Sequence, residues 1–465
     1  MSTIAPWRLR AAFARRLSTM YGREVPAYNT LVQVSEEVNR DVVGRDGDAA
    51  QRLGTIDRIT AERHGAIRVG TPTELAQVAR IFGALGMRPV GFYDLREAAR
   101  SAVPVISTAF RPVDADELAR NPFRVFTSML TPADPRFFSP ELRARLERFL
   151  ATRELFGPEL LALADRAEAG QGLPEADAER FLELAVQAFE LSPEPVDRAW
   201  YAELEAVSAV AADIGGVGST HINHLTPRVL DIDDLYRRMT ERGIEMIDTI
   251  QGPPRWRGPD VLLRQTSFRA LAEARAMREA DGTIDTGALR VRFGEVEARG
   301  VALTPEGRSR YDTLLTEIDR RLAGSPGRGR ADVAVEVWEQ GLPDTEAGLR
   351  EQDLAYFTYT AVSARPDGVP PESLSDLVEQ GWVTATPIVY EDFLPRSAAG
   401  IFQSNLSGEG SRDIRAAGIG YDREWLAAAI DREIHDPFHL YAREQAVSLE
   451  AVAADLNLTT LKDTP

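Results

Sequence analysis

Cysteine is absent from this sequence of 465 residues, and lysine occurs once, at Lys462. The absence of cysteine excludes disulfides, thiolate nucleophiles, iron–sulfur clusters and cysteine-based zinc sites. Any metal must therefore be bound by histidine, aspartate or glutamate, a ligand set that suits iron, manganese or zinc. The near-exclusive use of arginine as the basic residue supports no mechanistic conclusion.

An excess of positive charge and a long apolar run are also missing. The formal charge is −18, which argues against binding to nucleic acid or to an anionic membrane surface. No apolar stretch approaches the roughly 20 residues of a membrane span, and the first ten residues lack the pattern of a signal peptide. We therefore expect a soluble cytoplasmic protein with two or three domains' worth of structure, or one large elaborated domain, and no indicated oligomeric state.

A repeated pattern organises the residues that are present. Residues 62–68 read E-R-H-G-A-I-R, and residues 220–228 read T-H-I-N-H-L-T-P-R. In each stretch a histidine precedes an arginine by four positions, and a strand-like segment, a helix-like run and further strand-like segments follow. The pairs are His64 with Arg68 and His224 with Arg228. The same order of elements therefore occurs twice, which indicates an internal duplication.

The first helix after this pattern has clear boundaries. Thr71 and Glu74 have the spacing of a capping box, Pro72 occupies the first helical position, and Gly86 is placed to end the helix. We also predict a strand over residues 56–69, and strands at 88–95, 102–111 and 122–130 in the first repeat and at 223–230, 244–250, 261–267 and 291–298 in the second.

These signals predict an α+β chain in five segments. The segments are 1–55 (a helical N-terminal arm), 56–135 (the first strand–helix–strand module), 136–212 (a helical insertion), 213–305 (the second module) and 306–465 (a mixed region that covers the site).

The two repeats predict one metal site. Two histidines and a carboxylate from separate strands can bind a divalent metal and leave open positions for substrate and O2. His64 and His224 occupy equivalent places in the repeats, which favours a shared site over two unrelated core histidines. His221, three residues from His224, falls on the opposite strand face, so we assign it a supporting or packing role. Glu295 and Glu297 point to the same strand face, so either can supply the carboxylate.

Arginines beside such a site are candidates for binding a substrate carboxylate, because a guanidinium pairs with it bidentately. Arg68 is the preferred residue, since Arg228 follows a proline that can turn it away. Arg396, with Ser397 beside it, is a third candidate in a segment that we expect to lie over a cavity.

A second histidine pair, His435 and His439, has the four-residue spacing of a helical metal clasp. Pro437 lies between them and interrupts the helical turn. We therefore expect these two histidines to have a structural role.

Four separated motifs resemble one family, the 2-oxoadipate dioxygenases/decarboxylases of the vicinal oxygen chelate superfamily. They are E-R-H-G-A-I-R at 62–68, H-I-N-H-L-T-P-R at 221–228, G-E-V-E-A-R-G-V-A-L-T at 294–304 and E-D-F-L-P-R-S-A-A-G-I-F-Q-S-N-L at 391–406. The piece E-V-E-A-R also resembles the segment of 4-hydroxyphenylpyruvate dioxygenases whose glutamate is the third iron ligand. That correspondence points to Glu295 rather than Glu297.

The resemblance implies two βαβββ modules that form a cupped mixed sheet around a metal. It implies an Fe(II)-dependent reaction that converts 2-oxoadipate and O2 to 2-hydroxyglutarate and CO2 in lysine breakdown. The residues it assigns are His64, His224 and Glu295 for Fe(II), and Arg68, Arg396 and Ser397 for the substrate. Two other functions stay open: a glyoxalase-like isomerase that uses zinc or nickel, and a non-catalytic protein that binds an oxo acid.

Overall fold

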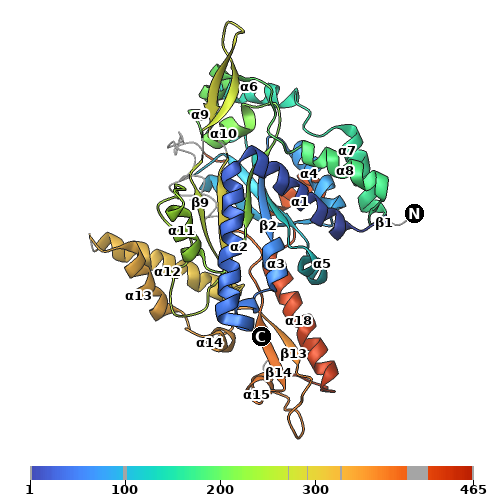
Figure 1. Ribbon diagram of the computed structural model, residues 1–465, viewed down its shortest axis with the longest axis vertical. Coiled ribbons are helices and arrows are strands. Elements are labelled where there is room, and N and C mark those ends of the chain that lie inside the picture. The colour runs from blue at the N-terminus through green and yellow to red at the C-terminus, as the bar shows by residue number, and fades with distance from the viewer. Residues whose placement is uncertain are drawn as a thin grey trace.

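A computed structural model describes residues 3–97, 102–270, 272–290, 292–324, 327–394 and 417–462. Helices and strands alternate along the chain and form the α+β fold predicted from the sequence (Figure 1). Among the described residues, no helix is both long and apolar enough to cross a membrane.

The first repeat folds as a strand, a helix and three strands, with one short helix added. Its elements are β2 (Arg63–Val69), α4 (Pro72–Ala84), β3 (Arg88–Asp94), β4 (Val105–Arg111), α5 (Ala115–Arg120) and β5 (Arg124–Leu130). The predicted capping box between Thr71 and Glu74 is present at the start of α4. Gly86 follows the helix with a φ of 70°, a conformation that glycine adopts without a Cβ clash.

The first strand begins later than residues 56–69 predict. Ile56–Ala61 forms a helix, α3, and the side chain of Thr55 caps it by accepting a hydrogen bond from the backbone N–H of Arg58. The cap satisfies a helix N–H group locally, which outweighs the β-branched content of this segment. The prediction is therefore wrong for residues 56–61 and correct from Arg63 onward.

The second repeat has the same core order with an insertion. Its elements are β8 (Ile222–Pro227), α11 (Ile232–Glu241), β9 (Leu263–Phe268) and β12 (Gly294–Arg299). A hairpin of β10 (Glu273–Arg278) and β11 (Ile284–Leu289), which the sequence analysis missed, lies between β9 and β12 and stands out from the body beyond α9 (Arg198–Glu205) (Figure 1). The strand predicted at 244–250 is not regular: Met246 pairs with Phe268 only at an isolated bridge.

The two repeats meet along β2 and β8. One sheet contains five strands in the order β3-β4-β5-β2-β8, with β2 parallel to β5 and antiparallel to β8. β12 and β9 form an antiparallel pair beside it, where the backbone N–H of Val229 donates to the carbonyl of Glu297 at 2.8 Å. The opening strands of both repeats and the glutamate-bearing strand thus lie next to one another.

Helices cover both faces of the sheet. The predicted N-terminal arm consists of α1 (Pro6–Glu24) and α2 (Pro26–Asp46), each with proline in its first turn. The insertion contains α6 (Pro140–Ala151), α7 (Pro158–Ala169), α8 (Glu175–Gln187), α9 (Arg198–Glu205) and α10 (Ala209–Gly215), with the short strands β6 (Leu173–Pro174) and β7 (Val196–Asp197). The N-terminal strand β1 (Thr3–Ile4) pairs with β6. Ile67 and Val69 of β2 belong to the apolar core that includes α1, α2, α7 and α8, whereas Ala66, on the other face of the strand, belongs to the core that includes α6, α9 and α10.

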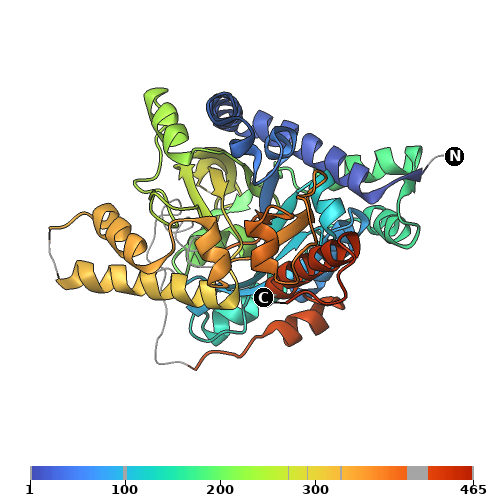
Figure 2. The same ribbon diagram turned by 90° about the horizontal axis from the view of Figure 1, so that it is seen from below.

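The C-terminal region is mixed, as predicted. Its elements are α12 (Pro305–Gly324), α13 (Arg330–Gly341), α14 (Glu346–Glu351), β13 (Phe357–Ala361), α15 (Leu374–Glu379), β14 (Val383–Pro387), α17 (Arg423–Ile430) and α18 (Pro437–Asp455). α12 and α13 extend to one side of the molecule and α18 lies on the other (Figure 2). The five-segment division of the chain stays a prediction.

Candidate metal centre

Three side chains from three neighbouring strands converge on one point. His64 comes from β2, His224 from β8 and Glu295 from β12, and one ligand atom of each lies within 4.8 Å of the others. In the register of β2 and β8, His64 is opposite Thr226 and Ala66 is opposite His224. The two histidines therefore share one face of the sheet and are diagonal neighbours. No other group of this kind occurs within the described part of the chain.

The separations within this group fit a bound ion. Nε2 of His64 lies 3.2 Å from Oε1 of Glu295, and Nε2 of His224 lies 3.8 Å from Oε2. The imidazole rings are nearly perpendicular, with centroids 5.4 Å apart. Metal–ligand bonds of about 2 Å place neighbouring donors roughly 3 Å apart. Two imidazole nitrogens and one carboxylate form a donor set that suits Fe(II) with open positions.

The pKa values of the two histidines are shifted in opposite directions. Burial lowers the pKa of His64, but the carboxylates of Glu297 and Glu295 outweigh burial and shift the pKa upward. Burial lowers the pKa of His224 well below its usual value, and the charges of His64 and Arg68 add to this. His224 is therefore neutral near pH 7, which leaves an Nε2 lone pair for a metal. Burial also raises the pKa of Glu295, an effect that a neighbouring cation would reverse.

Aromatic rings surround the imidazoles. The ring of Phe393 lies 5.0 Å from that of His64, and the ring of Phe293 lies 5.1 Å from that of His224. Phe126 in turn packs on Phe393 at 5.0 Å. These side chains keep water from the metal side of the sheet, which strengthens electrostatic interactions there.

Glu297, the alternative carboxylate, lies behind His64. Its Oε2 is 3.0 Å from Nδ1 of His64, on the other side of the ring from Glu295. Arg299 donates two hydrogen bonds to it, at 2.6 and 3.0 Å. Arg299 and His64 outweigh the effect of burial and hold the pKa of Glu297 far below its usual value. Glu297 is thus an anion already paired on the far side of His64, and the structure favours Glu295 as the ligand.

Arg68 lies on the same face of β2 as His64, four residues along the strand. Its guanidinium pairs with Asp213 of α10, and both side chains are buried. Asn223 donates a hydrogen bond to the same carboxylate at 2.9 Å, and Nε2 of His221 lies 3.4 Å from it. Burial, which outweighs the attraction of Asp213, lowers the pKa of His221 to about 4. His221 therefore contacts Asp213 and stands outside the triad.

Arg228, another arginine predicted for the substrate, forms a buried ion pair with Glu62. Its guanidinium donates to Glu62 at 3.1 Å and to the carbonyl of Leu53 at 3.0 Å, so its charge is already neutralised. Because β8 ends at Pro227, the chain turns there, as the sequence analysis anticipated. A role for Arg228 in substrate binding stays a prediction.

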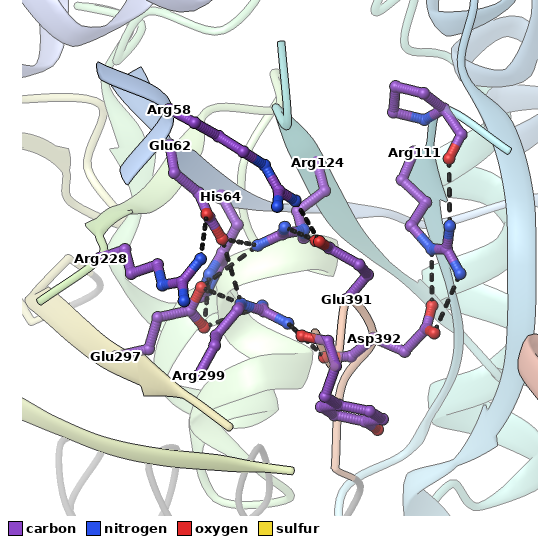
Figure 3. Close-up of polar contacts among 12 residues, drawn as sticks. Arg58, Glu62, His64, Arg111, Arg124, Arg228, Glu297, Arg299, Glu391 and Asp392 are labelled. Atoms are coloured by element: carbon purple, nitrogen blue, oxygen red, sulfur yellow. Dashed lines mark hydrogen bonds and ion pairs between the residues drawn. The ribbon is translucent and has the colours of Figure 1, made fainter. Parts of the chain in front are cut away.

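Arg228 belongs to a buried cluster of charges, which we call the arginine–glutamate network and which Figure 3 shows. Its members are Arg58, Glu62, Arg124, Arg228, Glu297, Arg299 and Glu391. Arg124 bridges Glu62 at 2.8 Å and also pairs with Glu391, which follows β14. The network thus connects the first repeat, the second repeat and the C-terminal region next to His64.

The remaining predicted residues fall in two groups. Arg396 and Ser397 lie outside the described residues, and their role stays a prediction. His435 precedes α18, whose first residue is Pro437 and whose N-cap is Asp436, so His435 and His439 do not share a helical face. The carbonyl of His435 instead accepts a backbone hydrogen bond from Gly91 at 2.9 Å, which agrees with a structural role.

A cavity of about 430 Å³ is connected to the surroundings of the metal centre through one wall residue, Phe393, and none of the three ligands lines it. Phe393, which contacts the ring of His64, forms part of its wall, together with Tyr93, Arg308 and Arg423. A volume of this size is within the range of small-molecule sites.

Sequence reasoning missed two residues of the site. Asp213 lies in the helical insertion, which carries no motif. Phe393 lies in the motif at residues 391–406, where only Arg396 and Ser397 were given a role. The spacing of Glu295 and Glu297 identified both carboxylates but did not separate the ligand from the residue behind His64.

Comparison with known proteins agrees with this geometry. The sequence model of the 2-oxoadipate dioxygenase/decarboxylase family matches residues 13–405. A protein of that name from Mycobacterium tuberculosis is 57% identical over 93% of this chain and 95% of its own length. The Pseudomonas putida protein of that name is 42% identical over 98% and 99%. The crystal structure of the hydroxyglutarate synthase from Pseudomonas putida in complex with 2-oxoadipate matches with a TM-score of 0.84 and 40% identity, over 98% of this chain and 100% of that one.

Proposed function

Since this chain belongs to the 2-oxoadipate dioxygenase/decarboxylase family, we propose that it converts 2-oxoadipate and O2 to 2-hydroxyglutarate and CO2, with Fe(II) bound by His64, His224 and Glu295. The observation that carries the proposal is the convergence of these three buried side chains within 4.8 Å. When bound, Fe(II) supplies the chelation of a 2-oxo acid and the activation of O2. The protein itself contributes the binding of the substrate carboxylate and the exclusion of water.

Arg68 is the residue that we assign to a substrate carboxylate. It shares the inner face of β2 with His64, and a guanidinium binds a carboxylate through two parallel hydrogen bonds. Asp213, which pairs with Arg68, limits the side chain to one orientation. A substrate carboxylate then enters a site whose cation is already positioned.

The aromatic side chains around the histidines provide the second contribution. Phe393 and Phe293 flank the two imidazoles, so the reacting carbon atoms lie in a poorly hydrated space. Exclusion of water protects the reactive stages of an oxidation and strengthens the pairing of carboxylate with Arg68. No separate 2-oxoglutarate cosubstrate is required, because the substrate is itself a 2-oxo acid.

An oxygen-consumption assay tests the proposal. The assay offers a series of four- to seven-carbon 2-oxo acids to the purified protein loaded with Fe(II). With 2-oxoadipate, the protein should consume one molecule of O2 and release one molecule of CO2 for each molecule of substrate. With ¹⁸O2, the product should carry label in both its new carboxylate and its hydroxyl group. Turnover without O2 would favour the glyoxalase-like isomerase, and binding of 2-oxoadipate without turnover would favour the non-catalytic protein.

A further inference from the structure

Glu297 contacts the proposed metal ligand His64 but does not itself reach the metal position. Oε2 of Glu297 lies 3.0 Å from Nδ1 of His64, while Nε2 of the same ring lies 3.2 Å from Glu295. The exposed fraction of Glu297 is 0%, so solvent does not screen its charge. An anion here acts on the tautomer of the imidazole.

We propose that Glu297 is a positioning residue that holds the proton of His64 on Nδ1 and thereby leaves the lone pair of Nε2 for the metal. The proposal deepens the function above and rests on the metal site assigned there. The physical reason is electrostatic. A carboxylate repels a nitrogen lone pair and attracts an N–H group, and at this distance in a dry interior one tautomer is strongly favoured. Carboxylates behind metal-bound histidines act in this way in general.

Arg299 fixes the carboxylate in place. Its Nε donates to Oε1 of Glu297 at 2.6 Å and its Nη2 donates to Oε2 at 3.0 Å. The third nitrogen, Nη1, donates to the backbone carbonyls of Tyr390 and Asp392 at 2.7 and 3.1 Å. One guanidinium therefore ties Glu297 to the segment that precedes Phe393, the residue packed on His64 (Figure 3).

The contacts of the two carboxylate oxygens make the variant Glu297→Gln informative. Oε1 accepts from Arg299 and lies 3.3 Å from Arg124, whereas Oε2 accepts from Arg299 alone and faces His64. The amide oxygen of glutamine should take the Oε1 position, because two arginines donate there. Its NH2 group then faces Nδ1 of His64 and donates to it, which places the imidazole proton on Nε2 and blocks the metal.

Glu62 provides a matched control. It belongs to the same network, it is also fully buried, and it accepts from Arg124 at 2.8 Å and from Arg228 at 3.1 Å. Glu62→Gln removes the same charge from the same cluster, but the contacts of its side chain are with arginines and not with His64. A purely structural role for these glutamates predicts equal effects of the two substitutions.

The test measures binding of Co(II) to the full chain, which does not depend on turnover. We expect Glu297→Gln to weaken binding by about 10- to 100-fold, Glu297→Asp to recover part of the loss, and Glu62→Gln to bind nearly as tightly as the unaltered protein. Equal loss in Glu297→Gln and Glu62→Gln, or no loss in Glu297→Gln, would overturn the proposal. If the unaltered protein bound no Co(II), the metal site itself would be wrong and both proposals would fall together.

A spectroscopic measurement keeps the proposal testable even where Glu297→Gln lowers stability. The measurement is NMR of the histidine ring nitrogens in the Zn(II)-loaded, ¹⁵N-histidine-labelled protein. Because the chain has only five histidines, the ring signals of His64 can be assigned by substitution. We expect a protonated Nδ1 in the unaltered protein and in Glu62→Gln, and an unprotonated Nδ1 in the residual folded Glu297→Gln. A protonated Nδ1 in Glu297→Gln would contradict the assigned role.

Discussion

The two histidines of the metal centre occupy corresponding places in the two repeats, yet their surroundings differ. Nδ1 of His64 faces Glu297 and, through it, a cluster of buried charges. The carboxylate contact of His224 is instead at Nε2, which lies 3.8 Å from Glu295, and its ring packs against Phe293. The pKa of His64 is raised by carboxylates that outweigh its burial, and the pKa of His224 is lowered by burial. Equivalent positions in a duplicated sequence therefore do not imply equivalent electrostatics.

Removal of either ligand is the strongest test of whether the two halves share one ion. We expect His64→Ala and His224→Ala each to abolish metal loading and turnover, since two of three protein ligands cannot retain the metal. Metal content after dialysis and oxygen consumption are the measurements. His221→Ala is the control and should retain its metal. Loss of metal in His221→Ala with full loading in His224→Ala would show that the other histidine of this strand is the ligand.

Substitutions on the charged side of the site should lower the free energy of unfolding more than substitutions on the apolar side. Arg124→Met leaves Glu62 and Glu391 buried without their shared cation, and we expect a loss of about 3–5 kcal/mol in the free energy of unfolding. Phe293→Leu, beside His224, keeps an apolar group and should cost about 1–2 kcal/mol. Urea unfolding of the metal-free proteins checks both values. Similar losses would mean that the network contributes no more than ordinary packing.

Arg68→Lys tests the substrate side of the first repeat. Lysine keeps the charge but loses the bidentate fork, so we expect the KM for 2-oxoadipate to rise tenfold or more, about 1.4 kcal/mol per decade. Asp213→Asn should raise KM in the same direction, because it removes the partner that orients Arg68. Steady-state kinetics at saturating O2 measures both. Unchanged kinetics in Arg68→Lys would remove this residue from the substrate site.

The smallest expected effect is a difference in pH dependence between the two histidines of the metal-free protein. Because the pKa of His64 is raised in the folded protein, its protonation stabilises the fold. This contribution is fully present below the pKa of His64 in the unfolded chain and is lost as the pH rises through its pKa in the folded protein. The lowered pKa of His224 has the opposite sign: stability falls as the pH drops below about 6.5, where only the unfolded state takes up the proton.

Urea unfolding between pH 7.5 and 5.5 measures this difference. Relative to the unaltered protein, acidification should favour the folded state in His224→Asn and disfavour it in His64→Asn, by at most about 1.4 kcal/mol per pH unit. Slopes that change in the same direction would contradict the different electrostatics of the two ligands.

Much of the fold follows from local signals that the sequence carries. The capping box at Thr71 and Glu74 and the glycine at Gly86 determine the ends of α4, because caps and left-handed residues act over a few positions. The strand expected at residues 56–61 is wrong for the same reason, since the cap at Thr55 competes locally with β-branched content. The β10–β11 hairpin has no counterpart in the first repeat, so the duplication gives no indication of it.

The sequence by itself determined the α+β class and the pair of repeats, and it singled out two histidines and two glutamates as candidates, because strand alternation and repeat spacing are properties of the chain. The tertiary structure alone decided what each glutamate does. Glu295 and Glu297 share one face of β12, but only the packing of β2 and β8 against that strand places one beside both Nε2 atoms and the other behind His64. The pairings of Arg68 with Asp213 and of Arg228 with Glu62 were decided by the tertiary structure for the same reason. The partner of a buried charge is set by contacts between residues that are distant in sequence, and spacing along the chain carries no record of them.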